Sequence, residues 1–190
     1  MLLYMIRHGQ SESNLGHFHG GWAQVNLTPK GKEDAKKAGE SIKGISFDKV
    51  YSSDLVRALQ TSEIALPDKE PTVTALLREI NVGDLSRKCS DDCKKLYGEK
   101  YDLAKSKRDF TAFNGESTED QMNRARDFLK LLEADPCDRV AAFCHGGTIR
   151  CVLSIVMGLT ELDDTHLCKN GGVSIFEFSE GKWSLVQWDI

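Results

Sequence analysis

Short apolar runs alternate along the chain with longer amphipathic stretches. Brief runs of this kind are typical of strands buried in a sheet. They are found at Leu2–Ile6, Lys49–Tyr51, Thr72–Leu76, Val140–Cys144, Val173–Phe178 and Trp183–Trp188. The last two runs flank the turn Ser179-Glu180-Gly181-Lys182, and together they predict a terminal hairpin.

Capping residues mark the starts of two helices between these strands. Thr28 is followed by Pro29, which suits the first helical position, and the residues that then share one face are Ala35, Ala38 and Ile42. Ser117 and Asp120 form a capping-box pattern. Apolar residues at helical spacing follow at Met122, Ala125, Phe128, Leu129 and Leu132. The alternation predicts an α/β fold, a three-layer αβα sandwich whose sheet is mostly parallel with an antiparallel edge strand.

The 190 residues suit one domain spanning 1–190. One stretch departs from the compact pattern. Residues 83–114 are rich in Lys, Asp and Ser and have few apolar positions for their length. We expect them to form a helical excursion over the sheet that does not belong to its core.

Polar residues capable of catalysis follow four of the predicted strands. Arg7-His8-Gly9 comes after the first strand and Ser52-Ser53-Asp54, with Arg57, after the second. Arg78-Glu79 follows the third strand, and His145-Gly146-Gly147 follows the fourth. Because α/β sheets bind ligands beyond the carboxyl ends of their strands, two histidines, two or three arginines and one glutamate are predicted to converge on one rim.

These residue types suit phosphate chemistry. Arginine offers planar, bidentate donors for phosphate oxygens, and neutral imidazole can attack phosphorus at pH 7. Backbone N–H groups at the helix that His145-Gly146-Gly147-Thr148 opens can face an anion. Glu79 supplies a group able to protonate a leaving alkoxide, and for that role we expect shielding from water to raise its pKa.

The chain resembles the histidine phosphatase superfamily, which includes cofactor-dependent phosphoglycerate mutases and small-molecule phosphatases. The matching blocks follow the family's order over nearly the whole chain. They are 7–14 (RHGQSESN), 21–22 (GW), 27–31 (LTPKG), 51–61 (YSSDLVRALQT), 77–81 (LREIN), 115–117 (GES) and 145–150 (HGGTIR). The resemblance implies a phosphoglycerate mutase-like fold in which residues 83–114 cover the active site.

The resemblance also implies roles for individual residues. His8 would be the phosphorylated nucleophile, and Arg7, Arg57 and His145 would clamp the transferring phosphoryl group. Glu79 would be the general acid and then the base for water. The residues implied to bind substrate are Arg7, Asn14, Gly21, Arg57 and Gly146. The family implies no metal and no cofactor, since the arginines supply the counter-charge.

Three functions are compatible with this site. The first is hydrolysis of a small phosphorylated metabolite, the second is mutase-type transfer, and the third is phosphate binding without catalysis. Mutases of this kind generally have a larger insertion after the glutamate and an extended tail, whereas this sequence ends at Trp188-Asp189-Ile190, so hydrolysis is predicted. The Trp-Glu-Gly that commonly follows the glutamate block is replaced at 85–87, and Gly20 stands where Thr or Gln is common, which leaves the substrate open.

Composition and charge argue against several classes of protein. A net charge of −4 argues against nucleic-acid binding, and no apolar run is long enough to span a membrane. Without a secretory signal, a cytoplasmic protein with its six cysteines reduced is expected. His17 and His19 are interpreted as a solvent-facing loop beside the pocket, not a metal site, and Cys89 and Cys93 as incidental. The sequence carries no signal for the oligomeric state.

Overall fold

The computed structural model of the protein describes residues 1–159, 166 and 168–190. Its strands are β1 (Leu2–Arg7), β2 (Lys49–Ser52), β3 (Thr72–Val73), β4 (Arg139–Cys144), β5 (Val173–Ser179) and β6 (Lys182–Gln187). Its α-helices are α1 (Glu12–Leu15), α2 (Pro29–Ser41), α3 (Val56–Ala65), α4 (Ser90–Tyr97), α5 (Glu99–Lys107), α6 (Thr118–Ala134) and α7 (Gly146–Val156). Three short 3-10 helices in this part of the chain are η1 (Ala75–Leu77), η2 (Gly83–Leu85) and η3 (Thr111–Phe113).

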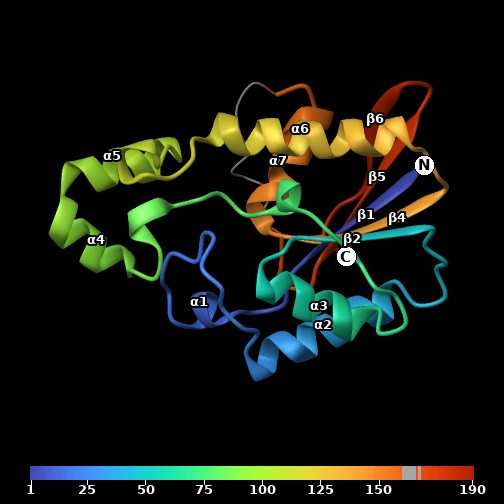
Figure 1. The fold of residues 1–190 in the computed structure, drawn as a ribbon, viewed down its shortest axis with the longest axis horizontal. Coiled ribbons are helices and arrows are strands. Elements are labelled where there is room, and N and C mark those ends of the chain that lie inside the picture. The colour runs from blue at the N-terminus through green and yellow to red at the C-terminus, as the bar shows by residue number, and fades with distance from the viewer. Residues whose placement is uncertain (160–165, 167) are drawn as a thin grey trace.

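The strands form one mixed sheet in the order β3-β2-β4-β1-β5-β6 (Figure 1). β3, β2, β4 and β1 are parallel neighbours, whereas β5 pairs antiparallel with β1 and β6 pairs antiparallel with β5. The predicted α/β class, the mostly parallel sheet and the antiparallel edge are therefore confirmed. The terminal hairpin is also present, and it supplies both antiparallel strands.

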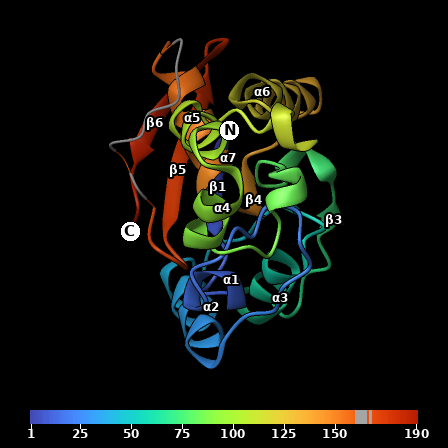
Figure 2. The same ribbon diagram turned by 90° about the vertical axis from the view of Figure 1, so that its left-hand side faces the viewer.

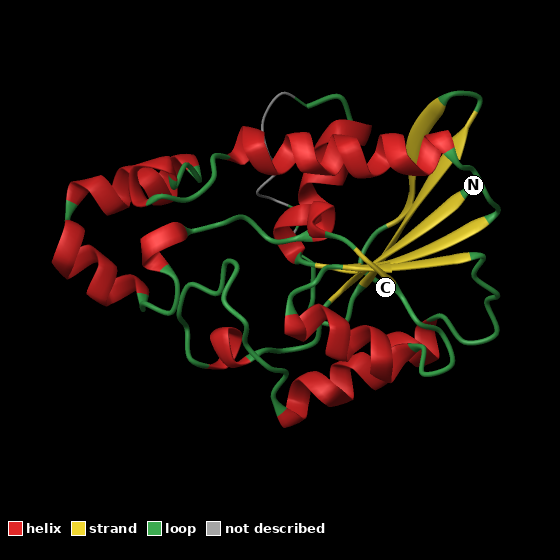
Figure 3. Ribbon diagram, viewed as in Figure 1, coloured by secondary structure: helices red, strands yellow, loops and turns green. Residues whose placement is uncertain are grey.

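Helices cover both faces of the sheet, with α2 and α3 on one side and α6 and α7 on the other (Figure 3). The central strands alternate between the two faces. Leu3 and Met5 of β1 join the core under α6 and α7, whereas Tyr4 and Ile6 join the core under α2 and α3. Because both faces of β1 and β4 are buried, these strands appear in the sequence as continuous apolar runs.

The third predicted strand is largely wrong. Only Thr72 and Val73 pair as β3, both are exposed, and Ala75–Leu77 form the 3-10 helix η1. An apolar run cannot by itself distinguish a strand from a short helix that buries one residue. Leu77 is that residue, since it is fully buried against the α6 side of the core. The 3-10 turn thereby delivers Arg78 and Glu79 toward the sheet edge.

The two predicted helix starts are confirmed. The Thr28 side chain accepts a hydrogen bond from Gly31 N at the start of α2. Ser117 and Asp120 form a reciprocal capping box at the start of α6. These bonds satisfy backbone donors that a helix leaves unpaired in its first turn.

The excursion over residues 83–114 contains α4 and α5 and has a small core of its own. This core is made of Ile80, Val82, Leu85, Cys93, Tyr101, Ala104, Phe110 and Phe113. Figure 1 shows α4 and α5 extending beyond the end of the sheet, and Figure 2 shows them in front of its carboxyl edge. The segment therefore stands off the end of the sheet and does not lie on a face.

No helix among the described residues combines the length and the apolar character that a membrane span requires.

Candidate active site

His8 follows β1 directly and is almost fully buried, with 4% of its surface exposed. Its Nδ1 lies 2.7 Å from the carbonyl oxygen of Gly9. A carbonyl can only accept, so Nδ1 carries the proton and Nε2 presents its lone pair. Arg57 Nε donates to this Nε2 from 3.2 Å, which agrees with that tautomer. The unprotonated ring nitrogen is therefore Nε2, and its lone pair accepts the bond from Arg57.

The surroundings of His8 keep its imidazole neutral. Burial, followed by the positive charges of Arg57 and Arg7, lowers the pKa of His8 well below its usual range. The hydrogen bond to Gly9 opposes this shift. A neutral imidazole is the form that can act as a nucleophile, and His8 is held in that form at physiological pH.

Two backbone contacts fix His8 in place. Its N–H donates to the carbonyl of Cys144 at 3.0 Å, which extends the pairing of β1 with β4. Its carbonyl accepts from Asn170 Nδ2, also at 3.0 Å. The sequence does not predict Asn170 as a site residue, because nothing in it connects residue 170 with residue 8. Only the antiparallel pairing of β5 with β1 brings the loop before β5 beside His8.

Arg57 in the first turn of α3 is buried and its guanidinium group is held on several sides. It donates through Nε to His8, and its two terminal nitrogens donate to the carbonyls of Ala23 and Gly21 at 3.1 and 2.8 Å. Burial is the main cause that lowers its pKa, to about 10. Arg57 is thus still positively charged at neutral pH.

Two buried nitrogen atoms around His8 have no hydrogen-bond partner in the described part of the chain. They are Nε of Arg7 and Nδ1 of His145. The other ends of these side chains are anchored, since Arg7 donates to the carbonyl of Cys168 and His145 Nε2 lies 2.9 Å from Ser53 Oγ. The two imidazole rings of His8 and His145 are 5.1 Å apart. Buried unpaired nitrogens of this kind indicate a site that is completed by a ligand with acceptor atoms.

Glu79 enters the site from the segment after η1 and is half-buried. Its Oε1 accepts from Ile80 N and from Gln121 Nε2, both at 2.9 Å. Its Oε2 accepts from Gly147 N at 3.0 Å, at the start of α7. The carboxylate is therefore held by donors from three separate parts of the chain.

The expected rise of the Glu79 pKa is wrong for the unliganded site. Burial does act to raise it, but the charge of Arg108 and the hydrogen bonds from Ile80, Gly147 and Gln121 outweigh burial. The result is a pKa of about 2. All three bonds donate to the carboxylate and stabilise its charged form, which the sequence could not reveal.

A second group of residues holds the backbone of Glu79. Trp22 Nε1 donates to the Glu79 carbonyl at 2.7 Å, and Arg124 NH2 donates to the same oxygen at 3.1 Å. Arg124 also forms a two-point ion pair with Glu116, whose Oε2 accepts from Asn81 N. The sequence does not predict this role of Arg124, because the residue lies on α6 and belongs to no local motif.

Arg78 pairs with Asp54, so of the three arginines predicted to converge only Arg7 and Arg57 lie beside His8. Arg78 donates to Asp54 through two nitrogens, and its guanidinium carbon lies 4.4 Å from the Trp22 ring centroid. This ion pair lowers the pKa of Asp54, mainly through the hydrogen bond that Arg78 donates.

The remaining predicted binding residues lie around this centre. Asn14 uses its Oδ1 to accept from Ser11 and Asn170, which leaves its Nδ2 as the donor for a phosphate oxygen. The Gly21 carbonyl is occupied by Arg57. Gly146 packs against Arg7, since a Cβ there would be 3.3 Å from Arg7 Nε. The substrate contacts of Asn14, Gly21 and Gly146 stay predictions.

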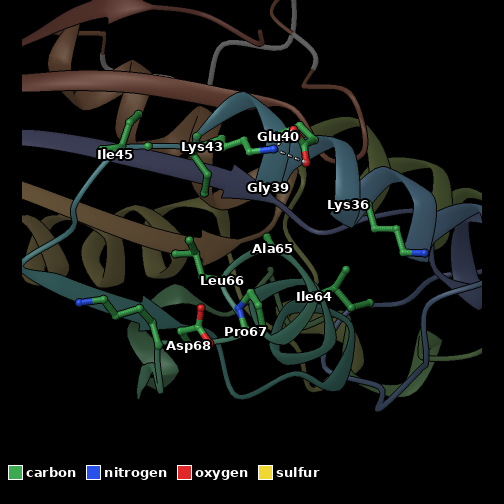
Figure 4. A pocket seen from close by; sticks show the side chains of 13 residues that line it. Lys36, Gly39, Glu40, Lys43, Ile45, Ile64, Ala65, Leu66, Pro67 and Asp68 are labelled. Carbon is green, nitrogen blue, oxygen red and sulfur yellow. Dashed lines mark hydrogen bonds and ion pairs between the residues drawn. The ribbon is translucent and has the colours of Figure 1, made fainter.

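A cavity of about 370 Å³ adjoins these residues and is lined by Arg7, Glu79, Gly146, Gly147, Arg150 and Cys168. A larger cavity of about 610 Å³ lies between the C-terminal ends of α2 and α3 (Figure 4). Its walls carry lysines, Glu40 and Asp68 beside Ile42 and Leu66, and no histidine or arginine. Because these helix ends precede β2 and β3, this second cavity opens at the amino edge of the sheet, away from His8.

The histidines of the 17–19 loop take different positions. His17 is exposed, and His19 is half-buried with its Nε2 2.8 Å from the Tyr101 hydroxyl of α5. Burial and the charge of Lys105 lower the pKa of His19. This loop thus contacts the excursion through His19, a contact that the interpretation as a solvent-facing loop did not include.

Residues 3–190 match the Histidine phosphatase superfamily (branch 1), and the chain belongs to this family. It is 34% identical to a 2,3-bisphosphoglycerate-dependent phosphoglycerate mutase of Rhodopseudomonas palustris, over 84% of this chain and 82% of that protein. A mutase of the same name from Parvibaculum lavamentivorans is also 34% identical, over 87% and 83%.

Solved structures share the fold. The alpha-ribazole phosphatase of Shigella flexneri superposes with a TM-score of 0.89 at 24% identity, covering 100% of this chain and 96% of that one. A mycobacterial glucosyl-3-phosphoglycerate phosphatase, in complex with VO3, superposes with a TM-score of 0.86 at 25% identity, over 99% and 98%. The predicted family and the phosphoglycerate mutase-like fold are thus confirmed.

Proposed function

We propose that the protein is a phosphomonoester hydrolase that acts on a small phosphorylated metabolite through a phosphohistidine on His8. The observation that carries this proposal is the arrangement around Nε2 of His8. The lone pair of a neutral, buried imidazole lies beside Arg57, and the unpaired nitrogens of Arg7 and His145 complete a receptacle for phosphate oxygens. Preorganised donors of this kind stabilise the charge that spreads over a transferring phosphoryl group.

In the first step, Arg57 Nε transfers its hydrogen bond from His8 Nε2 to a phosphate oxygen, which frees the Nε2 lone pair. Nε2 then attacks phosphorus, and the bond from phosphorus to the ester oxygen breaks. Arg7, Arg57 and His145 hold the equatorial oxygens. The leaving oxygen takes a proton from the Glu79 carboxyl group and departs as an alcohol. The products of this step are phosphorylated His8, the alcohol and the Glu79 carboxylate.

In the second step, the Glu79 carboxylate takes a proton from water while the water oxygen attacks phosphorus. The bond from phosphorus to His8 Nε2 breaks, and inorganic phosphate leaves. Glu79 regains the proton that it donated, so the cycle balances. Glu79 is half-buried beside the cavity, which leaves room for water to reach it.

A pKa of about 2 leaves Glu79 ionised in the unliganded protein, so its proton has to arrive with the substrate. A phosphate monoester loses its second proton at a pKa of about 6. Binding of the monoanion beside the Glu79 carboxylate delivers one proton to be shared. As the phosphate becomes a dianion in the arginine cage, its negative charge raises the pKa of Glu79.

This proton transfer predicts a specific pH dependence. For an alkyl phosphate, kcat/KM should fall about tenfold for each pH unit above about 6, because the monoanion disappears. With an aryl phosphate, kcat/KM should fall less steeply, because its leaving group needs no proton. On the acid side, the lowered pKa of His8 keeps its imidazole neutral. We therefore expect no fall in kcat/KM when the pH drops just below the usual pKa range of histidine. An alkyl profile that stays level up to pH 8 would contradict this proton source.

Mutase-type transfer is the second candidate, and the mutase names of relatives with 34% identity favour it. These relatives are matched over more than four-fifths of their length, so chain length does not separate the two functions. A mutase has to keep water from its phosphohistidine until the phosphoryl group is returned. The half-buried Glu79 and the phosphatase names of the structural relatives support hydrolysis instead.

One experiment decides between these reactions. The protein is incubated with 2- and 3-phosphoglycerate and with a panel of other phosphorylated metabolites, and both inorganic phosphate and isomerised product are measured. We expect stoichiometric release of inorganic phosphate from at least one monoester. Rapid exchange between the two phosphoglycerates with little free phosphate would assign mutase activity. Phosphate binding without any turnover would favour the third candidate, a catalytically silent module, which the presence of His8, Glu79 and His145 in one site argues against.

The excursion is proposed to cover the site and contact the part of the substrate beyond its phosphate. Arg108 ends α5 in a left-handed conformation with a φ of 48°. Its Nε is buried and unpaired among the described residues, and its charge acts on Glu79. We therefore propose Arg108 as the residue of the excursion that contacts the substrate. We also propose that the enzyme is cytoplasmic and needs no metal or cofactor.

A further inference from the structure

Gln121 is a fully buried amide on the otherwise apolar inner face of α6. It is 0% exposed, and the next inward residues of the helix, Met122, Ala125 and Phe128, belong to the main core. A side-chain amide is costly to bury unless its hydrogen bonds are satisfied. The contacts of Gln121 therefore indicate what it does.

The amide of Gln121 is satisfied on one end only. Its Nε2 donates to Glu79 Oε1 at 2.9 Å and lies 3.4 Å from Thr148 Oγ1. Its Oε1 is buried with no partner in the part of the chain that the structure describes. A methionine of similar size would fill this position without an unpaired oxygen. The presence of an amide here is therefore explained by its hydrogen bond to Glu79 and not by packing in the core.

The two oxygens of Glu79 are bonded unequally. Oε1 accepts from both Ile80 N and Gln121 Nε2, so both of its lone pairs are used. Oε2 accepts from Gly147 N alone in this part of the chain. The lone pair that is open to a proton therefore belongs to Oε2.

We propose that Gln121 is a positioning residue that anchors Oε1 of Glu79, so that Oε2 is the atom that exchanges protons with the leaving group and with water. This inference rests on the proposed hydrolase function and deepens it. Gln121 acts through Glu79 and touches neither phosphate nor water. Loss of its amide frees the carboxyl group to rotate away from the leaving oxygen.

The charged and titratable groups around Glu79 come from several elements. Arg7 and His8 lie at the end of β1, Arg57 on α3, Arg108 at the end of α5, and Cys151 and Cys168 on the α7 side. Burial raises the pKa of each of these two thiols to about 12, so they stay uncharged at neutral pH. Replacing Gln121 leaves this set intact, which isolates the effect of the amide.

The test compares two leaving groups in the full-length protein. Gln121→Met and Gln121→Asn are measured with an alkyl phosphate, which needs a proton, and with p-nitrophenyl phosphate, which does not. The value of kcat/KM covers only the steps up to departure of the leaving group. We expect kcat/KM of both variants to fall about 10- to 100-fold with the alkyl phosphate, which corresponds to a lost hydrogen bond to a charged group. With the aryl phosphate, kcat/KM should fall less than about threefold.

Two further variants calibrate this result. Glu79→Gln removes the acid altogether. Its kcat/KM with the alkyl phosphate should therefore fall further than that of the Gln121 variants, again with a smaller effect on the aryl phosphate. Ser62→Ala removes another buried polar atom that lacks a partner among the described residues, on α3, and should leave both substrates unchanged. Because the unpaired oxygen disappears, Gln121→Met should melt at or above the temperature of the wild type.

The outcomes are distinct. Equal losses on both substrates, an unchanged alkyl rate, or a lower melting temperature in both Gln121 variants would assign the amide to the fold and overturn the proposal. If the wild type forms no phosphohistidine on His8, the hydrolase function itself fails, whatever the Gln121 variants do.

Discussion

Replacing His8 with alanine is expected to abolish turnover of every phosphomonoester, with a loss of roughly ten-thousand-fold or more in kcat, as for other enzymes that lose their nucleophile. The arginine cage would still bind phosphate, but no atom could accept the phosphoryl group. The rate is measured with p-nitrophenyl phosphate. Acid-labile label on the protein is measured separately, after a brief exposure to a phosphate-labelled substrate. The variant should carry no label.

His17→Ala is the matched control for this experiment. His17 lies in the nearby loop and is exposed, so its loss should change neither the rate nor the labelling. A thermal melt of both variants verifies folding. Full activity in the His8 variant, or label that persists without His8, would show that the phosphoryl group is carried elsewhere.

Gly147→Ala is expected to lower kcat/KM for alkyl phosphates by about 100-fold. A Cβ at this position would lie 2.0 Å from Glu79 Oε1, a contact that neither atom can tolerate. The α7 backbone is fixed because its buried residues belong to the main core, so the carboxylate is the group that moves. Displacement of a catalytic group by about 1 Å can cost about 100-fold. Alanine is a better helix former than glycine, so the fold should not weaken.

A double-mutant cycle tests whether this loss passes through Glu79. In a Glu79→Ala background the added methyl group meets no carboxylate, so Gly147→Ala should cost little further activity. Coupled residues give such non-additive effects. Fully additive losses would mean that the methyl group disturbs another part of the site, such as the start of α7.

The sequence predicted much of the active site, because its chemistry lies in short local motifs. Arg7, His8, Arg57, Glu79 and His145 were all predicted at strand ends, and the structure brings all five to one place. The failures occurred where tertiary contacts decide. Thr72–Leu76 resembles a strand by its apolar run, but Leu77 has to be buried against α6, and the chain turns as a 3-10 helix to do so.

The protonation state of Glu79 was beyond the reach of the sequence for a similar reason. Burial alone predicts a raised pKa. The pKa is lowered first by the charge of Arg108 and then by hydrogen bonds from Ile80, Gly147 and Gln121. Except for Ile80, these residues are distant from Glu79 in the sequence. No local pattern indicates which backbone N–H will point at a carboxylate.

By itself, the sequence determined the family and the α/β class and predicted His8 as the nucleophile, since these depend on residue types at fixed positions along strands and helix starts. Only the tertiary structure decided which imidazole nitrogen of His8 is unprotonated, that Asn170 contacts His8 and Gln121 contacts Glu79, and that Arg78 forms an ion pair with Asp54. Each of these depends on atoms brought together from distant segments within hydrogen-bond distance. Such distances are set by the packing of the sheet, α6 and α7, and not by the order of residues along the chain.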